Sequence, residues 1–585
     1  MTIVLRVFLI CLILTSCSNT ILEIEDRDYK IVEAPQLSVI GEEQEDYFLF
    51  KGIPYAEPPV GNLRWKAPIP FSSNETFDSS EFKDECVQPK VQSSFIDRRT
   101  ISGNEDCLYL NVYVPKNNID FEKNNLPVMF WIHGGSNIWG SGSSYDFSNL
   151  AKQKDVIVVT INYRLGVFGW FSSDFIRESS SGLDQTSNFG HLDIIEALKW
   201  TNRNIKSFGG DPDNITIFGE SAGGHNVLTL IASPLAKNLF QKAISQSGYV
   251  ATHSVEFATK NSELSSEKIF EDDIKYLTDS QEIVSFLRNL SSEEVYNKYI
   301  STAEKHPYPI TPISVRDDIV IPTEGLYKSL ENIDPELVVI AGTNRDEMNY
   351  WYIRSGYFFD TTLELRRSLI RSEENFKSWN KYRSNIWRYR GAEEPLRRMS
   401  KSNDNLYSYR FDWDEERNGP LGNYQLFLGA AHGIEIPFVA QTFNMEQIPW
   451  YVKPLIFPES SEAGRMALSE QMMTFWSNIA KYGDPNMFGE YKNWEKFTPD
   501  NQSYLRLDNP NDNLIEMIND PVDPIELVNK LKSDSTLEIK ERCLLGWIAV
   551  RQFSEFEDPN PPFNFCADFS EEELSLFRRE VEGQE

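Results

Sequence analysis

The sequence predicts an α/β protein built on a large, mostly parallel sheet that is flanked by helices. Three observations carry this prediction. Residues 128–132 and 156–161 are short, continuously apolar runs, which are typical of strands covered on both faces. Apolar residues recur at helical spacing within residues 193–208. The apolar residues 215–218 then run into the turn at 219–223 and an apolar helix, so strands and helices alternate along the chain.

The length of 585 residues, with 40% hydrophobic and 13% aromatic side chains, allows a large buried core. Two further buried strands are expected at residues 337–341 and 406–411. The helix-rich, charged segments 254–331 and 361–402 are interpreted as insertions over the active site. Neither an internal repeat nor a clear linker divides the chain, so residues 18–585 are expected to form a single domain, with an acidic C-terminal extension from about residue 530.

The formal net charge of −31 excludes nucleic acid as a partner, because phosphates require clusters of Lys and Arg. A strongly acidic surface fits an exported protein, although it says nothing about the fold.

The first 17 residues are interpreted as an export signal. Arg6 supplies the positive charge, and the apolar run that follows it is too short to span a bilayer. The four residues ending at Cys17 resemble the lipobox of bacterial lipoproteins, which predicts a lipidated Cys17 and attachment to a membrane; an ordinary cleavage site is the alternative. In either case the protein is expected outside the cytoplasm, as an anchored lipoprotein or as a secreted or periplasmic protein.

Four cysteines follow the signal, and an oxidising compartment favours disulfides. Their proximity in the sequence suggests the pairs Cys86–Cys107 and Cys543–Cys566, with buried free thiols as the alternative. If the second pair forms, it ties down the acidic tail that starts at about residue 557.

The turn at residues 219–223 has the G-x-S-x-G pattern of a nucleophile elbow. Gly219 and Gly223 let the backbone turn sharply, so the Ser221 hydroxyl is held out at the end of the sheet. The pattern alone is weak, since an inert serine in a Gly-rich turn has the same appearance. Its position between a strand and a helix favours the catalytic interpretation.

With these motifs in place, the chain resembles the type-B carboxylesterase/cholinesterase family of α/β-hydrolases over residues 39–507. The resemblance implies an α/β-hydrolase fold and a carboxylic-ester hydrolase. It rests on six motifs in the same order: GIPYAEPP at 52–59, EDCLYLN at 105–111, FGGDP at 208–212, the elbow at 219–223, HGIEIPF at 432–438 and WSNIAKYGDPN at 476–486.

The resemblance implies a catalytic triad of Ser221, Glu347 and His432, in the chain order of this fold. His432 would act as the base that takes the proton of Ser221, and Glu347 would hold the imidazole in one tautomer. Asp346 is the alternative acid. The chain has Met348 where the family usually has glycine, so this motif departs from the pattern.

For the oxyanion, the resemblance implies backbone N–H donors at Gly135, Ser136 and Ala222. The family has a glycine where this chain has Ser136. The N–H group is retained; the added side chain is expected either to narrow the acyl pocket or to supply an extra hydroxyl donor.

Two structural ion pairs are implied as well, Arg64 with Glu105 and Arg164 with Asp193. Histidines at metal-ligand spacing and a dinucleotide fingerprint are absent from the sequence, so neither a metal nor a cofactor is expected. Between Cys86 and Cys107 there is also no tryptophan of the kind that binds choline in cholinesterases, which predicts a member of the family that is not a cholinesterase.

The sequence therefore predicts a serine carboxylesterase that hydrolyses small-molecule esters through an acyl-enzyme intermediate. A lipase of longer acyl chains and a non-catalytic adhesion or recognition protein are the alternatives. Adhesion relatives typically lack part of the triad, whereas this chain has every member. The sequence does not predict the natural ester or the oligomeric state.

Overall fold

The computed structural model describes residues 29–92, 95–116, 125–262, 264–303, 313–360, 367–419, 421–444, 450–553 and 566–582. The predicted export signal, with Cys17, lies outside the described residues, as do residues 554–565 and 583–585.

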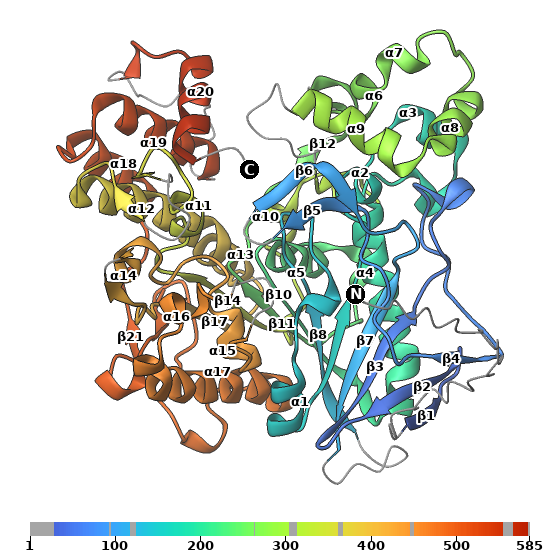
Figure 1. Cartoon of the computed structure of the whole chain (residues 1–585), viewed down its shortest axis with the longest axis horizontal. Helices are drawn as coiled ribbons and strands as arrows, with labels where there is room; N and C mark the ends of the chain where they lie inside the picture. Colours follow the sequence, from blue (N-terminus) through green and yellow to red (C-terminus); the bar gives the residue numbers. More distant parts are fainter. Residues whose placement is uncertain are drawn as a thin grey trace, which may run out of the picture.

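A mixed sheet runs through the molecule (Figure 1). Among the described residues it has thirteen strands, of which one, β4 (Thr76–Asp78), pairs only with β2. The others lie in the order β1 (Tyr29–Glu33), β2 (Ser38–Glu43), β3 (Tyr47–Pro54), β7 (Tyr109–Pro115), β9 (Ile157–Ile161), β8 (Leu126–Ile132), β10 (Gly210–Glu220), β11 (Lys242–Gln246), β14 (Val338–Asn344), β17 (Leu406–Phe411), β20 (Tyr504–Leu507) and β21 (Glu516–Ile518).

From β9 to β20 every neighbouring pair of strands is parallel, and both ends of the sheet are antiparallel. The large, mostly parallel sheet predicted from the sequence is therefore confirmed. Because the central strands point the same way, their C-terminal ends form one edge, where ligands bind in open α/β sheets.

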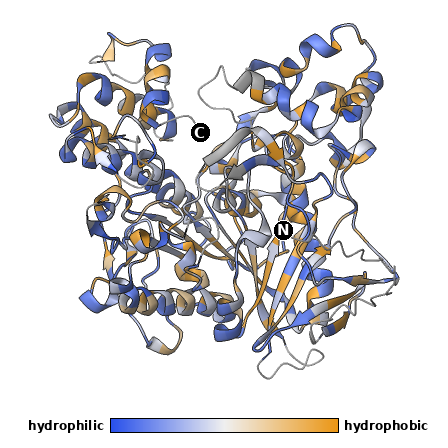
Figure 2. Ribbon diagram, in the orientation of Figure 1, coloured by the Kyte–Doolittle hydropathy of each residue, from blue (hydrophilic) through white to orange (hydrophobic). Residues whose placement is uncertain are grey.

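Side chains of the central strands alternate between two hydrophobic layers. In β8, Val128 and Phe130 enter one layer, whereas Met129 and Trp131 enter the other. Figure 2 shows hydrophobic residues gathered on the strands of the sheet and alternating with polar ones along the outer helices. The first layer is covered by α4 (Phe189–Asn204) and α5 (Ala222–Ala232), and the second by α1 (Ser148–Lys154), α15 (Ile436–Ala440) and α17 (Glu462–Tyr482).

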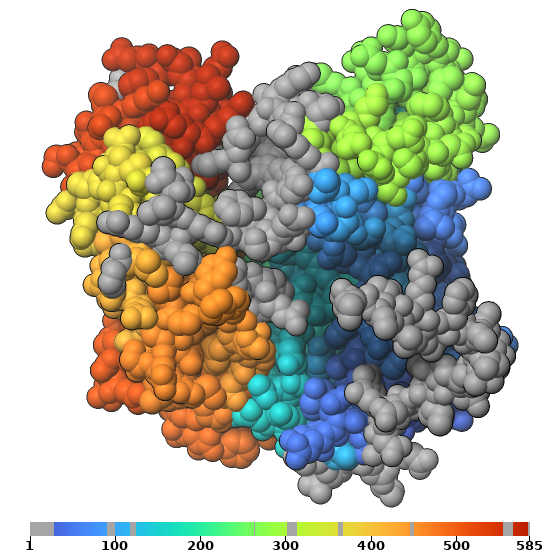
Figure 3. All heavy atoms as spheres, viewed as in Figure 1, coloured from blue at the N-terminus to red at the C-terminus, as the bar shows by residue number. Residues whose placement is uncertain are grey.

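Two helical lobes stand on opposite sides of one end of the molecule (Figures 1 and 3). One lobe contains α3 (Asp174–Ser179), α6 (Ser266–Ile269), α7 (Glu271–Ile274), α8 (Ser280–Asn289) and α9 (Ser292–Ala303), which share a small core of their own. The other, here named the C-terminal lobe, contains α11 (Asn349–Tyr352), α12 (Glu373–Arg388), α18 (Pro524–Ser533), α19 (Ile539–Gln552) and α20 (Glu571–Glu582).

The C-terminal end of the chain is tied to the lobe, as expected if the second disulfide forms. The end of the acidic extension forms a packed helix, because Leu574, Phe577 and Val581 recur at helical spacing and are buried against α11, α12 and α19. The disulfide Cys543–Cys566 joins the start of α19 to the residues before α20.

Among the described residues, no helix combines the length and the apolar composition that a membrane span requires.

The buried carboxylate of Glu541 holds the C-terminal lobe together. It accepts hydrogen bonds from the Tyr357 hydroxyl (2.7 Å), Trp379 Nε1 (2.9 Å), Asn375 Nδ2 (2.9 Å) and the backbone N–H of Glu538 (2.6 Å). These donors come from the segment before α12, from α12 itself and from the start of α19. The network therefore ties the C-terminal helices to the chain that follows β14.

Substitution of Glu541 by Ala is expected to lower stability by about 3 kcal/mol, because it leaves several buried donors without an acceptor. The midpoint of urea unfolding, followed by tryptophan fluorescence, measures the change. Glu526 is the matched control, since its partner Lys530 lies on an exposed face of α18, and Glu526→Ala is expected to cost less than about 0.5 kcal/mol. Equal midpoints for the two variants would contradict the role given to Glu541.

Candidate active site

The backbone turns sharply at Ser221, between β10 and α5. Ser221 has φ 58° and ψ −120°, a conformation that L-residues rarely adopt. A Cβ atom added at Gly219 or at Gly223 would lie 2.5 Å or 2.0 Å from the carbonyl oxygen of Ile132, at the end of β8. Only glycine fits at both positions, which is the physical reason for the spacing of the motif.

The turn is fixed from both sides. The backbone N–H of Ser221 donates to the carbonyl of Gln246 in β11 (2.9 Å), and the N–H of His225 donates to the carbonyl of Ser221 (2.9 Å). The Ser221 side chain is half-buried at the C-terminal edge of the sheet, at the N-terminus of α5. A developing negative charge beside it would be stabilised by the helix dipole.

The loop after β8 lies against this turn. A Cβ at Gly134 would lie 3.0 Å from the Cβ of Ser221. Gly135 and Ser136 both have positive φ, 93° and 57°. The backbone N–H groups of Gly135, Ser136 and Ala222 donate to no acceptor among the described residues, so all three are available to an oxyanion.

A buried amide pair couples this loop to α5. Asn137 Nδ2 donates to Asn226 Oδ1 (3.2 Å), and Asn226 Nδ2 donates to Asn137 Oδ1 (2.9 Å). The hydroxyl of Tyr163 also donates to Asn137 Oδ1 (3.0 Å). Because Asn226 belongs to the helix that follows Ser221, the amide pair fixes the position of the loop relative to the nucleophile turn.

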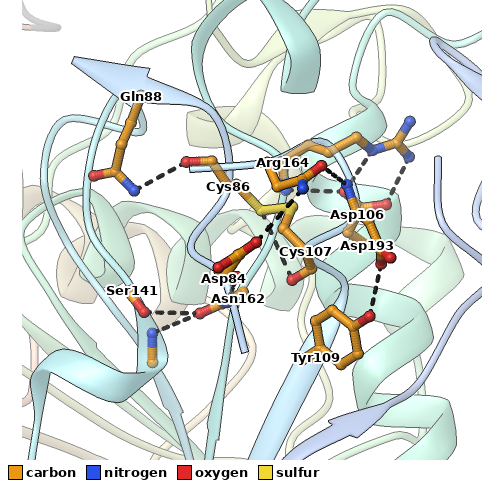
Figure 4. Close-up of a disulfide and its surroundings, with 12 residues drawn as sticks. Asp84, Cys86, Gln88, Asp106, Cys107, Tyr109, Ser141, Asn162, Arg164 and Asp193 are labelled. Atoms are coloured by element: carbon orange, nitrogen blue, oxygen red, sulfur yellow. Dashed lines mark hydrogen bonds and ion pairs between the residues drawn. A yellow bond between two sulfur atoms is a disulfide. The ribbon is translucent and has the colours of Figure 1, made fainter. Parts of the chain in front are cut away.

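The far end of the loop is attached to the first disulfide, Cys86–Cys107 (Figure 4). Gln88 bridges the two segments: its Nε2 donates to the carbonyls of Cys86 (3.0 Å) and Gly140 (3.1 Å), and its Oε1 accepts from the N–H of Gly140 (2.8 Å). The disulfide loop therefore supports the segment that carries the oxyanion donors.

Glu347 and His432 meet at the same edge of the sheet although they are far apart in sequence. Glu347 follows β14, is fully buried and accepts from the N–H of Asn344 (2.8 Å). Its other oxygen lies 2.5 Å from His432 Nδ1. The N–H of His432 also donates to the carbonyl of Glu347 (3.3 Å), so the imidazole is held by both backbone and side chain.

Asp346, the alternative acid, points away from the imidazole. Its carboxylate binds the guanidinium of Arg345 (2.6 Å), Asn380 Nδ2 (2.7 Å) and the N–H of Ala430 (3.2 Å). These contacts brace the turn after β14. The geometry therefore favours Glu347 as the partner of His432.

The other imidazole nitrogen faces the residue that precedes the nucleophile. His432 Nε2 lies 3.2 Å from Glu220 Oε1, and no hydrogen bond joins it to the Ser221 hydroxyl in the part of the chain that is described. The imidazole is thus next to the turn, with Glu220 beside its free nitrogen. Catalysis by Ser221 requires Nε2 to turn from Glu220 toward the hydroxyl.

The electrostatics of the site follow from burial. Burial alone lowers the pKa of His432, but the carboxylates of Glu220 and Glu347 outweigh it and raise the pKa to about 9. Burial raises the pKa of Glu220 to about 8, although His432 opposes this rise. Both groups therefore have raised pKa values that lie close together, so the imidazole and the Glu220 carboxyl compete for a proton.

A third carboxylate, Glu435, lies behind this pair. It is fully buried, and it accepts hydrogen bonds from Asn344 Nδ2 (2.6 Å) and Gln246 Nε2 (3.3 Å). Burial raises its pKa. Glu220 and Glu435 were not predicted as site residues; in the sequence each is a glutamate inside a motif, the first at the elbow and the second after His432.

Substitution of Glu220 by Gln is expected to shift the acid limb of the pH profile of kcat/KM to lower pH by about one unit. Removing this carboxylate removes a cause of the raised pKa of His432, so the neutral imidazole persists at lower pH. Initial rates across the pH range measure the limb. Glu196→Gln is the control, since Glu196 binds Arg203 (2.6 Å) on α4, and it is expected to leave the limb in place. An unchanged limb in the Glu220 variant would show that His432 is not coupled to it.

An aromatic wall borders the imidazole. The rings of Trp351 and Trp387 lie 5.0 Å and 4.9 Å from the ring of His432, and Tyr350 lies 6.2 Å from it. Trp351 and Trp387 stack on each other (5.3 Å). The remaining aromatic residues up to Phe359 pack in the core of the C-terminal lobe.

The two predicted ion pairs are present and bidentate. Arg64 binds Glu105 through Nε (2.7 Å) and Nη2 (2.5 Å), and Arg164 binds Asp193 through Nε (2.7 Å) and Nη2 (2.6 Å). The second pair lies beside the first disulfide (Figure 4). No group of three or more His, Cys, Asp or Glu side chains among the described residues could hold a metal ion.

The sequence is similar to known esterases over most of its length. The model of the carboxylesterase family matches residues 28–378 and 368–522. The para-nitrobenzyl esterase of Bacillus subtilis (strain 168) is 33% identical over 511 residues, which cover 84% of this chain and 97% of that protein. The cocaine esterase of Homo sapiens is 32% identical over 502 residues, 78% of this chain and 83% of that protein.

Solved structures of esterases also match this chain. A thermophilic PNB esterase matches with a TM-score of 0.68 and 30% identity, over 84% of this chain and 98% of that one. The carboxylesterase EST55 of Geobacillus stearothermophilus matches with a TM-score of 0.65 and 28% identity over the same shares. The prediction of an α/β-hydrolase fold is thereby confirmed.

Proposed function

This chain belongs to the carboxylesterase family and is a carboxylic-ester hydrolase, and we propose that Ser221, His432 and Glu347 perform its chemistry through an acyl-enzyme intermediate. The observation that carries the proposal is the buried contact of 2.5 Å between Glu347 and His432 beside a serine in a strained turn. Three unused N–H donors next to the same serine support it.

In the proposed mechanism, His432 Nε2 takes the proton of the Ser221 hydroxyl as its oxygen attacks the ester carbonyl. Glu347 holds Nδ1–H and stabilises the imidazolium. The oxyanion is bound by the N–H groups of Gly135, Ser136 and Ala222, each worth roughly 3–4 kcal/mol. The imidazolium returns the proton to the departing alkoxide, which leaves the acyl group on Ser221.

Deacylation repeats these steps with water. His432 takes a proton from the water molecule that attacks the acyl carbonyl, and the proton passes to Ser221 as the acid is released. The carboxyl of Glu220 lies 3.2 Å from Nε2, so it is placed to bind the imidazolium when the proton is not on Ser221.

Turnover of p-nitrophenyl esters of increasing acyl length tests the proposed esterase. We expect kcat/KM to be highest for short acyl chains and at least about tenfold lower for palmitate, because the Ser136 side chain occupies a position where glycine would leave more room. A profile that rises with chain length would instead indicate a lipase. The absence of turnover with every ester would favour a recognition protein.

We also propose that the protein is exported through the signal at residues 1–17 and is anchored by a lipid on Cys17. The two disulfides fit an exported protein, since such bonds persist in oxidising compartments. The mass of the mature N-terminus tests the proposal: a diacylated Cys17 supports anchoring, whereas cleavage without lipid supports secretion.

A further inference from the structure

The end of α12 brings a guanidinium close to the aromatic wall of the site. Trp387, in the last turn of α12, has its ring 4.9 Å from that of His432. Three residues later, Arg390 places its guanidinium carbon 5.0 Å from the ring centre of Tyr249. The rings of Tyr249 and Trp387 lie 6.2 Å apart. The imidazole, an indole, a phenol and a guanidinium therefore form a chain of neighbouring groups.

Arg390 has no carboxylate partner among the residues that the structure describes. Its one hydrogen bond runs from Nη2 to the carbonyl of Val250 and is 3.5 Å long, at the limit for such a bond. Two arginines of α12, the helix before Arg390, are paired: Arg383 Nε lies 2.8 Å from Glu582, and Arg388 Nε lies 2.8 Å from Glu393.

This guanidinium is half-buried and keeps its charge, because arginine is not deprotonated in proteins. Burial lowers the pKa of Arg390. Tyr327 and Tyr249 raise it, and the like charges of Arg383 and Arg578 lower it further. No carboxylate is among these groups. In a chain with 88 acidic and 57 basic residues, a guanidinium that faces no acid leaves its donors available to an anion.

We propose that Arg390, together with Tyr249 and Trp387, forms a subsite that binds the free carboxylate of an ester substrate. The substrate class is the half-esters of dicarboxylic acids, in which one carboxyl is esterified and the other is ionised. A planar carboxylate matches the two parallel N–H groups of a guanidinium. The flat rings of Trp387 and Tyr249 accommodate the carbon chain between the two ends.

The subsite rests on the proposed function, because the ester end must reach Ser221. Hydrolysis adds water across the ester bond, releases the alcohol and leaves a dicarboxylate. Since the contacts that connect the imidazole to Arg390 run through both Trp387 and Tyr249, we expect acids with a long spacer to reach both ends better than short ones. The preference is therefore expected to appear as the spacer grows from succinate to sebacate.

Monoethyl and diethyl esters of the same acids, from succinate to sebacate, test the subsite with the full-length protein. The measured quantity is the ratio of kcat/KM for the monoethyl ester to that for the diethyl ester. In Arg390→Met this ratio is expected to fall by about 10- to 100-fold for the longer acids, mainly through KM, because a charge-assisted hydrogen bond is lost. Arg390→Lys is expected to recover part of the ratio, and Arg390→Glu to favour the diethyl ester.

Arg371 supplies the matched control. Its guanidinium carbon lies 4.0 Å from the ring centre of Tyr357, and it is half-buried in the C-terminal lobe, away from His432. Arg371→Met is expected to leave the ratio unchanged. Thermal unfolding verifies that the variants are folded, and Arg390→Gln, which retains a donor to Val250, replaces the Met variant if that one unfolds.

An unchanged ratio in Arg390→Met would overturn the subsite. This includes the case in which kcat/KM falls equally for both esters, which would indicate a structural role only. Failure of the proposed function has a different signature. If Ser221→Ala hydrolyses the diethyl esters as fast as the wild type, Ser221 is not the nucleophile, whatever the ratio for Arg390.

Discussion

Replacing Ser221 by Ala is expected to lower kcat for p-nitrophenyl butyrate by about 100,000-fold. The hydroxyl is the only group that the proposed mechanism acylates, and without it the imidazole and the oxyanion donors retain only a small part of the rate. Substrate binding is expected to change little, because the Ser221 side chain contributes one small polar group to the site. Initial rates and KM values with this ester measure both effects.

Ser233→Ala is the matched control for this loss. Ser233 ends the helix that starts at Ser221, and its buried hydroxyl has no partner among the described residues. Removing it is expected to leave kcat within about twofold of the wild type, as for substitutions that touch no special feature. If the Ser221 variant retained the wild-type rate, another nucleophile would have to be sought.

Local chemistry explains why so much of the centre of the fold could be predicted from the sequence. The strands expected at 128–132, 156–161, 337–341 and 406–411 correspond to β8, β9, β14 and β17. The first three are nearly continuous apolar runs, which require burial on both faces. The turn at Ser221 could also be predicted from the sequence, because the close approach of the Ile132 carbonyl leaves space only for glycine at two fixed positions.

Contacts between distant segments could not be derived in the same way. Glu347 and His432 are 85 residues apart, and only the family resemblance pointed to the pair. The contact of Glu220 with His432 Nε2 gave no local signal, because an acid beside a serine has the pattern of any polar turn. Ser136 has the left-handed conformation usually reserved for glycine, which a serine in the sequence does not reveal.

Overall charge alone does not predict how the C-terminal lobe packs. The acidic composition after residue 530 suggested an extension, and Leu531, Leu544 and Phe577 of this segment are buried in one core with Trp379 of α12. A spacing of three and four residues was present in the sequence at Leu574, Phe577 and Val581. The buried acceptor Glu541 could not be recognised, because its side-chain donors come from segments more than 150 residues away.

Replacing Glu347 by Gln is expected to lower kcat by about 1,000- to 10,000-fold. The amide keeps the size of the side chain, but it is neutral and cannot stabilise the imidazolium that forms as Ser221 loses its proton. The same change removes one cause of the raised pKa of His432, so the remaining activity is expected to extend to lower pH. A pH profile of the residual rate therefore separates this effect from simple unfolding, because unfolding would lower kcat without shifting the profile.

Asp346→Asn is the control that separates the two candidate acids, because the residues are adjacent and both become amides. Asp346 binds Arg345 and Asn380 and does not contact the imidazole. Its substitution is expected to cost about 1–3 kcal/mol of stability through the lost charged hydrogen bonds, with kcat within about threefold of the wild type. If the Asn variant instead lost most of its activity while the Gln variant kept it, the acid would be Asp346, and the turn after β14 would have to rearrange during catalysis.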